Sequence, residues 1–435
     1  MIIAVKAVLY NRLNMHGRSF ADAYRIEVKN NAAVYGRHID MNGSEYLAQA
    51  ENMKSELIEM YRYLHRHPEV AHKEVQTNLF IRKELEKLGI PYLAPADNIT
   101  IGLIDSGVPG ATVGLRCDTD ALPVQEDTGL PYASEVPGAM HACGHDAHIV
   151  NGIGAARLLV KNMGEWAGKV KLIFQPAEEG EAGAEEVIRT GLVDDVDVFF
   201  GIHVWSPYPT GEIHVSPTPV SATVDMFRIV INGKGGHGAT PEKCCDAVVA
   251  ASALVMALQT IVSRRISPME PALLTVGSLH AGTAGNIIAP DAEIKGTFRT
   301  FSAEVRDQIT KTLTEMSEQI AQSYGCKAEV FNRRLSDAVI NDPKAAEFAR
   351  QSAAELVGAS NVLPQRSMML GDDFADYGRI APYCYGQVGI ADAAKKTDYA
   401  HHNGKFRMDE DVIPLCAAWL ALTAARCGEG WKKST

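Results

Sequence analysis

Apolar positions along this chain follow two periods, and these periods predict helices that alternate with strands. Residues 46–66 and 75–88 place apolar side chains at intervals of three to four, which indicates two amphipathic helices. Short apolar runs then predict strands, at residues 99–104, 112–117, 170–174 and 196–202. Strands that alternate with helical runs indicate an α/β fold with a parallel or mixed sheet.

A second arrangement of elements begins near the two prolines at positions 217 and 219. It consists of a strand, a helix, two strands, a helix and a strand, at residues 223–231, 246–262, 272–279, 292–298, 303–323 and 327–331. This order predicts a compact βαββαβ unit inserted into the first domain, which resumes with helices at 342–357 and 412–426. The predicted segments are an N-terminal extension of unknown role, the main domain in two parts and the inserted domain, at residues 1–43, 44–218 with 332–435, and 219–331.

The charge and the cysteine content exclude several classes of protein. The 435 residues carry 42 Lys and Arg against 53 Asp and Glu, a formal charge of −11, which argues against nucleic acid and anionic membranes as partners. No apolar run approaches the roughly 20 residues that a membrane-spanning helix needs. Eight cysteines in so long a chain do not form a disulfide framework, and they favour a reducing compartment such as the cytoplasm.

Cysteine and histidine crowd into residues 140–148, where a loop meets the start of a predicted helix. Cys143 and His145 lie there, and thiolate with imidazole suits borderline and softer divalent metals. We expect the helix N-terminus to lower the pKa of the thiol. A buried, reduced cysteine beside ordinary histidines fits this short motif equally well, so the other ligands must decide.

Further candidate ligands follow the ends of the predicted strands. They are Asp118 and Asp120, the pair Glu178 and Glu179, His203 and, near the end of the chain, His402. Taken singly, the acidic pairs are equally compatible with turns and solvated loops. Taken together, Cys143, His145, Glu179, His203 and His402 are too many for a closed four-ligand zinc site, and they suit two ions that share a ligand. Glu178 is then free to act as the general base.

These residues lie in motifs that resemble the M20 metallopeptidase family, within its branch of aminoacylases, hippurate hydrolases and auxin-conjugate hydrolases. The motifs follow in family order, at residues 65–69, 116–123, 140–148, 175–180, 201–203, 235–237, 286–290 and 402–403. The resemblance implies the five metal ligands and the base named above, with Asp118 and Asp120 as supports behind them. It also implies an α/β fold in which a mixed-sheet catalytic domain carries an inserted βαββαβ lid that dimerises.

The expected reaction is metal-dependent hydrolysis of the amide bond of N-acyl amino acids by a cytoplasmic homodimer. Zinc or manganese are the first candidates for the two ions, and mixed sulfur, nitrogen and oxygen ligands also accept cobalt or nickel. In the lid, a guanidinium at Arg299 suits the substrate carboxylate, while His237 and Asn286 suit the developing oxyanion. Surface roles for Arg299 and His237 stay open. The resemblance implies that the histidine reaches across the dimer.

The sequence departs from the family motifs at two positions. Gly404 replaces a common proline and is expected to loosen its loop, and Asp372 replaces a usual glutamate in a wall of the pocket.

Three alternative functions stay open. They are a dipeptidase or carboxypeptidase of the same family, a cysteine hydrolase that uses Cys143, and a catalytically silent metal-binding protein.

Overall fold

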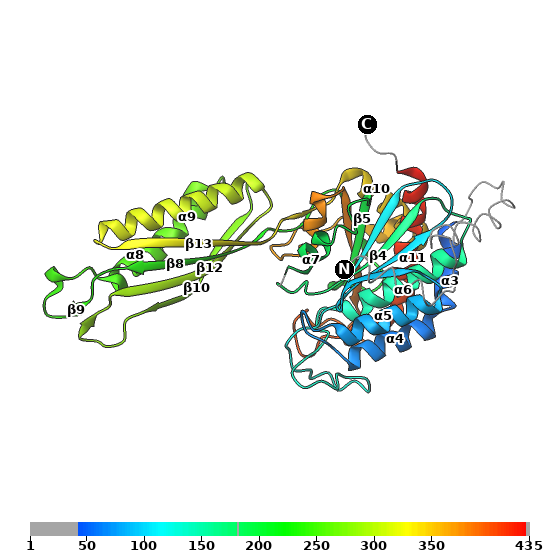
Figure 1. Ribbon diagram of the computed structural model, residues 1–435, viewed down its shortest axis with the longest axis horizontal. Helices are drawn as coiled ribbons and strands as arrows, with labels where there is room; N and C mark the ends of the chain where they lie inside the picture. Colours follow the sequence, from blue (N-terminus) through cyan, green and yellow to red (C-terminus); the bar gives the residue numbers. More distant parts are fainter. Residues whose placement is uncertain (1–41, 181, 432–435) are drawn as a thin grey trace, which may run out of the picture.

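The computed structural model describes residues 42–180 and 182–431, which form a larger α/β part and a smaller part that projects from it (Figure 1). Of the predicted extension 1–43, residues 1–41 lie outside the described residues. Asn42 and Gly43 belong to the fold, because Asn42 caps helix α3 (Gly43–Glu51) and the Gly43 N–H donates to Glu355 at 3.2 Å. The predicted start of the main domain at 44 is therefore late by these two residues.

The larger part is built on an eight-stranded sheet with the order β1-β2-β4-β3-β5-β16-β6-β15. The strands are β1 Tyr92–Ala96, β2 Ile99–Asp105, β3 Thr112–Asp118, β4 Lys169–Gln175, β5 Val198–Pro209, β6 Ile213–His214, β15 Val362–Leu363 and β16 Tyr383–Ala391. Strands β4, β3, β5 and β16 are parallel, whereas β1, β2 and β6 are joined by antiparallel pairs. The mixed α/β fold predicted from the sequence is thus confirmed.

Helices cover both faces of this sheet. One face packs against the main core, to which α4 Lys54–Arg66, α5 Val75–Lys87, α6 His145–Lys161, α10 Pro343–Val357 and α11 Ile413–Gly430 contribute. The other face carries a second core under α7 Gly183–Arg189 and the 3₁₀ segment η4 Asp373–Arg379. Strand β3 is therefore buried along its whole length, including its two charged residues, Arg116 and Asp118.

Several elements differ from the sequence expectations, among them helix α7, which was not predicted. The helix predicted at 46–66 is two helices, α3 and α4, with a break between them at Asn52 and Met53. Strand β1 and the central strand β16 were not predicted. Glycines interrupt the apolar pattern of β16, and they are needed there because Gly386 packs against the Trp419 ring and Gly389 against the Pro209 carbonyl.

The inserted unit, residues 224–336, is a four-stranded antiparallel sheet with the order β10-β12-β8-β13. Its elements are β8 Val224–Asn232, α8 Ala247–Thr260 with the π turn Ile261–Arg265, β10 Ala272–Ala281, β12 Asp291–Thr300, α9 Ala303–Ser323 and β13 Lys327–Ser336. Both helices pack on one face of the sheet (Figure 1). The predicted domain end at 331 falls inside β13, whose exposed polar residues hide its continuation in the sequence.

Within residues 42–180 and 182–431, two helices are long and apolar enough to cross a membrane by length and composition, contrary to the expectation that no run approaches that length. Within Glu410–Gly430, 89% of the apolar window is buried inside the protein, so α11 is a core helix. Within Ala247–Arg265 only 33% is buried, and α8 presents an apolar outer face.

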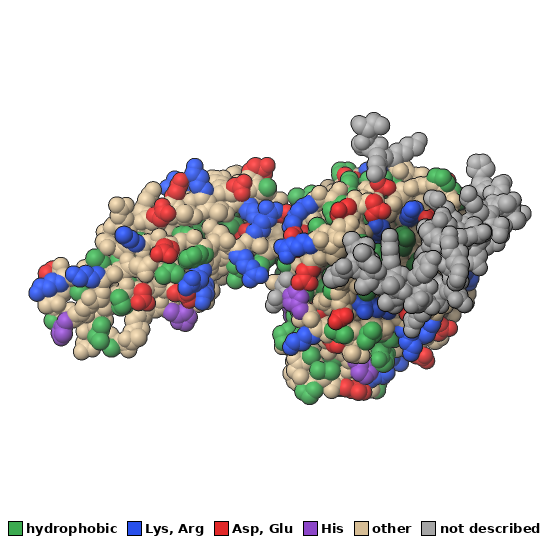
Figure 2. Space-filling model, viewed as in Figure 1, with side chains coloured by type: hydrophobic (Ala, Val, Ile, Leu, Met, Phe, Trp, Pro, Cys, Tyr) green, Lys and Arg blue, Asp and Glu red, His purple; other side chains and the backbone are tan. Residues whose placement is uncertain are grey.

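Two chain crossings join the parts, and they pair as short antiparallel strands, β7 Pro219–Ser221 and β14 Val339–Ile340. Beyond them the Thr223 N–H donates to the Thr300 carbonyl at 2.7 Å, so the inserted sheet begins at the junction. Lysine and arginine side chains gather around this narrow region (Figure 2).

Candidate metal centre

The sheet register brings the predicted site residues to one level. Asp118 at the end of β3 lies opposite Gln175 at the end of β4, and Arg116 lies opposite Gly201, two residues before His203. Helix α6 begins beside them, after Gly144 at φ 89°. A side chain at Gly144 would meet Val204 at 2.4 Å, so only glycine allows this close turn.

All five predicted ligands converge, in two overlapping groups. Ligand atoms of Cys143, His145 and His203 lie within 4.8 Å of one another, as do those of Cys143, Glu179 and His402. The Cys143 Sγ lies 3.5 Å from His203 Nε2, and His402 Nε2 lies 3.1 Å from Glu179 Oε1. Cys143 belongs to both groups, so it is placed to be shared between them.

The protein fixes which nitrogen each histidine turns toward the centre. His145 Nδ1 donates to the Asp120 carbonyl at 2.9 Å, and His203 Nδ1 donates to the Val204 carbonyl at 2.5 Å. The Nε2 atoms of both rings therefore face the site, where a metal ion can bind them. His148 differs, because Nδ1 donates to Asp118 at 2.5 Å and Nε2 accepts from the Val204 N–H at 3.0 Å. Both of its nitrogens are used, so His148 is a support and not a ligand.

Asp120 is the support that links the most parts of the site. Its side chain lies 3.2 Å from His145 Nδ1 and accepts the backbone N–H groups of Glu178 and Glu179, both at 3.1 Å. The loop that carries the two glutamates is thereby tied to the helix that carries His145. Asp118 holds His148 and pairs with Arg116, so both predicted aspartates lie behind the ligands.

A buried arginine that the sequence analysis did not single out organises the acids near Glu178. Arg116 donates to Gln175 at 2.9 Å, Asp372 at 3.2 Å and Asp373 at 2.9 Å, besides its pair with Asp118. The carboxylates of Glu178, Asp372 and Asp373 lie within 4.8 Å of one another. Burial, then the charges of Asp372 and Glu179, raise the pKa of Glu178 well above its usual value. The motif spacing gave no sign of this cluster, because Asp372 is 256 residues from Arg116.

The expected low pKa of Cys143 is wrong for the protein alone. Burial, followed by the charges of Glu179 and Glu178, raises the pKa of the thiol well above its usual value. These effects outweigh the N-terminus of α6. A buried environment with nearby carboxylates disfavours a free thiolate. It therefore argues against a cysteine hydrolase in which Cys143 is the nucleophile and His203 its base. A bound cation reverses that balance, because it favours the thiolate.

The residues present fit divalent metal ions. The donors are a thiol, three imidazoles and carboxylates, a set that zinc-like metals accept. His145 Nε2 is buried and has no hydrogen-bond partner among the described residues, an arrangement that a metal bond would satisfy.

His402 reaches the centre from a loop with a left-handed backbone, at φ 61°. Its N–H donates to the Ala142 carbonyl at 2.8 Å, which ties the loop to the cysteine segment. Gly404 does not loosen this loop. Its carbonyl accepts from the Asp127 N–H at 2.7 Å, and a Cβ there would lie 2.5 Å from the Gln125 carbonyl. The loop around Gln125 can approach this closely only because residue 404 is a glycine, and this contact holds the loop that carries His402 in place.

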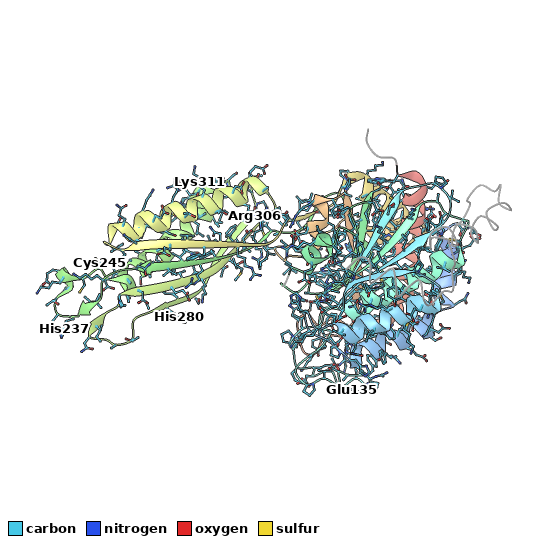
Figure 3. All side chains as sticks on the ribbon, in the orientation of Figure 1. Glu135, His237, Cys245, His280, Arg306 and Lys311 are labelled. Carbon is cyan, nitrogen blue, oxygen red and sulfur yellow. The ribbon has the colours of Figure 1, made fainter. Side chains whose placement is uncertain are left out.

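The three predicted substrate residues lie at opposite ends of the inserted unit. His237 and Asn286 meet at its far tip, where β9 Gly236–His237 pairs with β11 Ile287–Ile288 and the Gly238 N–H donates to the Asn286 carbonyl at 2.9 Å (Figure 3). Arg299 lies at the junction end of β12, one residue beyond the pair of Phe298 with Asp225. His237 is therefore remote from the metal ligands of its own chain.

Donors of these types at the carboxyl ends of the strands of an α/β sheet are typical of metal-dependent hydrolases. A family model described as peptidase family M20/M25/M40 matches residues 114–426. The chain belongs to this family.

Similar proteins include both a deacetylase and a carboxypeptidase. An N-acetylcysteine deacetylase of Bacillus subtilis (strain 168) is 39% identical, over 84% of this chain and 95% of that protein. Thermostable carboxypeptidase 1 of Saccharolobus solfataricus is 36% identical, over 85% of this chain and 95% of that protein. The crystal structure of the Bacillus subtilis YXEP protein, described as a dinuclear metal-binding peptidase of the M20 family, has a TM-score of 0.77 and 34% identity, over 87% of this chain and 99% of that one.

Proposed function

We propose that this protein is a dinuclear metal-dependent amidohydrolase that cleaves N-acyl amino acids to a carboxylic acid and a free amino acid. The observation that carries the proposal is the pair of overlapping ligand groups that share Cys143, with Glu178 beside them. The family membership and the deacetylase relative support the reaction.

In this proposal Cys143, His145 and His203 hold one ion, and Cys143, Glu179 and His402 hold the other. When bound, the ions supply Lewis-acid polarisation of the scissile carbonyl and of the attacking water. Zinc or manganese are the proposed metals, with cobalt and nickel compatible with the same donors.

Glu178 is the proposed general base. It is not needed to complete either ligand group, and its carboxylate lies 4.0 Å from His145 Nε2. It takes a proton from the attacking water and passes it to the leaving nitrogen. Asp120 fixes its backbone, so the base is held beside the ligands before substrate arrives.

The inserted unit acts as a lid that recognises the substrate. Within residues 42–180 and 182–431 Arg299 makes no ion pair, and one of its guanidinium nitrogens donates to Thr297 and the Phe298 carbonyl. Its positive charge is therefore available to a substrate carboxylate. His237 and Asn286 donate to the oxygen that becomes negative during the reaction. Because His237 lies at the far tip of its own lid, we propose that it serves the metal centre of the partner subunit in a homodimer.

An outward apolar surface favours this dimer. Helix α8 exposes Met256 (72%), Val249 (46%) and Val248 (41%), and β10 is an unpaired edge of its sheet. Light scattering at micromolar concentration should give a dimer, and the double variant Val249→Glu, Met256→Glu should give a monomer. Gln319→Glu, on the exposed side of α9, is the matched control and should stay dimeric. A wild-type monomer with full activity would remove the dimer from the proposal.

The activity is tested with purified protein, a panel of N-acyl amino acids and a chelator. The panel includes dipeptides, because a relative is named a carboxypeptidase. We expect hydrolysis of N-acyl amino acids, loss of activity with the chelator and return with added zinc or manganese. Activity that survives removal of the metal would favour a cysteine hydrolase, and absence of turnover in the metal-loaded protein would favour a silent metal-binding protein. We also propose a cytoplasmic location, since all eight cysteines are free thiols.

A further inference from the structure

One face of the inserted sheet is left open by α8 and α9. Along β8, Phe227 and Ile229 are buried under the helices, whereas Met226 and Arg228 alternate with them and are exposed on the other face. Side chains of successive strand residues point to opposite faces, so the open face carries the exposed members of all four strands. Arg299 lies on this open face, at the end nearest the junction.

Apolar side chains border Arg299 on this face. Leu273 of β10 is its register partner on one side. Val224 of β8 is its neighbour on the other, because Phe298 pairs with Asp225 and Thr300 bonds to Thr223. Register partners share a face, with Cβ atoms about 4.5–5.5 Å apart. Met226 follows one row further along and is 42% exposed. We call Val224, Met226 and Leu273 the apolar strip.

The apolar strip begins beside Gly371, the residue before Asp372, whose carboxylate lies near the proposed base Glu178. The Val224 side chain fills the place where a Cβ on Gly371 would stand, 1.9 Å from that point. The next residue, Asp372, has a carboxylate within 4.8 Å of that of Glu178. The lid surface that follows Val224 is therefore continuous with the wall of the proposed active site.

Ion pairs hold the row next to the apolar strip, whereas Arg333, the register partner of Met226 on β13, is a charged residue that borders the strip itself. One row beyond Met226, Arg228 and Lys295 both pair with Glu293, at 2.5 Å and 2.6 Å.

Arg299 instead has apolar register partners, Leu273 and Val224, and its guanidinium donates to Thr297 and to the Phe298 carbonyl of its own strand. Burial lowers the pKa of this guanidinium. A cation bordered by apolar side chains suits a ligand that places a carboxylate next to a hydrocarbon group.

We infer that the apolar strip reads the side chain of the amino-acid half of the substrate, and that it favours apolar residues such as leucine or methionine over glycine and over acidic residues. This inference rests on the proposed function. The α-carboxylate binds Arg299, and the side chain of the amino acid lies along Met226 and Leu273.

The test compares kcat/KM for N-acetyl-leucine, N-acetylglycine and N-acetylglutamate. We expect the wild type to prefer the leucine substrate, and Met226→Ala to lower the ratio of leucine to glycine by about three- to tenfold, the scale of roughly one buried methylene group. Met226→Leu, which keeps an apolar side chain of similar size, should keep the wild-type ratio of leucine to glycine. Phe331→Ala, on the same face but opposite Arg228, is the matched control and should leave the ratio unchanged. Leu273→Ala provides a second variant that should lower it.

The outcomes separate this inference from the proposed function. If no N-acyl amino acid is cleaved, the proposed function fails and the inference falls with it. If the substrates are cleaved but the ratio is unchanged in both Met226→Ala and Leu273→Ala, only the apolar strip is overturned. A preference for N-acetylglutamate that Arg333→Ala removes would also overturn it, because Arg333 lies beside Met226 and would then bind the second carboxylate.

Discussion

The two parts of the molecule hold their candidate site residues in opposite ways. In the larger part the ligands and their supports are mostly buried and joined by short hydrogen bonds, as with His148 and Asp118 at 2.5 Å. In the inserted unit His237 is exposed at the tip, and Arg299 lies at the other end of the same sheet. The first set can act within one chain, and Arg299 lies close to it at the junction, whereas His237 can meet it only through a second copy or a movement of the lid. The proposed chemistry and the proposed recognition residues thus belong to two separate cores.

The largest effect should come from the loss of the proposed general base, Glu178. Glu178→Gln removes a proton acceptor while it keeps the shape of the side chain, so kcat should fall about 10²–10⁴-fold with metal content unchanged. Steady-state kinetics with metal analysis measures both. Glu135→Gln, an exposed glutamate of the same part, is the control and should behave as the wild type. Loss of metal together with activity would make Glu178 a ligand.

The division between the parts is tested most directly by mixing two inactive variants. Glu178→Gln lacks the base and His237→Ala lacks the tip histidine. If the histidine acts across the dimer, random mixing makes half of the dimers mixed with one complete site each, so activity should return to roughly a quarter of wild type. If each lid serves its own chain, the mixture should stay as inactive as its components. Light scattering before and after exchange checks that dimers persist.

The difference between the parts also explains what the sequence could predict. The strands and helices that repeat a simple period, such as β3 and α9, were predicted within a residue or so of their bounds. The candidate ligands could be collected because the ends of parallel strands share one edge of a sheet. Strand β16 was missed, because close packing against Trp419 and Pro209 requires glycines that break its pattern.

Long-range electrostatics left no local signal in the sequence. The pairing of Arg116 with Asp372 and Asp373 joins distant segments, so no spacing rule identifies it. The raised pKa of Cys143 has the same origin, since the carboxylates that raise it come from another loop. The close approach of the segment around Gln125 to Gly404 likewise depends on tertiary packing, and the sequence alone predicted a looser loop.

A smaller effect is expected for the carboxylate clamp at the junction. Arg299→Ala removes a charge-assisted hydrogen bond, worth about 1.5–3 kcal/mol, so the preference for a free acid over its amide should shrink roughly ten- to a hundredfold. Paired kinetics on N-acetyl-leucine and its amide gives this preference. Arg333→Ala, which changes an exposed arginine of β13, two strands away from Arg299, should leave it nearly unchanged. A wild-type protein that cleaves acid and amide equally well would rule out the clamp.

The last prediction concerns the pH dependence of stability, through a buried ion pair at the start of the ligand helix. His65 Nδ1 lies 2.7 Å from Asp146, one residue after His145. Burial lowers the pKa of His65, but hydrogen bonds to Asp146 and Glu126 outweigh it and raise the pKa to about 9. A raised histidine pKa stabilises the fold fully below the unfolded value of about 6.5, and this stability is lost as pH rises toward 9. Denaturant unfolding of the metal-free protein should therefore show stability that declines between these values, by roughly 3 kcal/mol at most. His65→Gln should lack this decline, whereas His67→Gln, an exposed histidine of the adjoining turn, should retain it. If wild type and His65→Gln decline in parallel, the pair is not charged in the folded protein, and the ligand helix is held by packing alone.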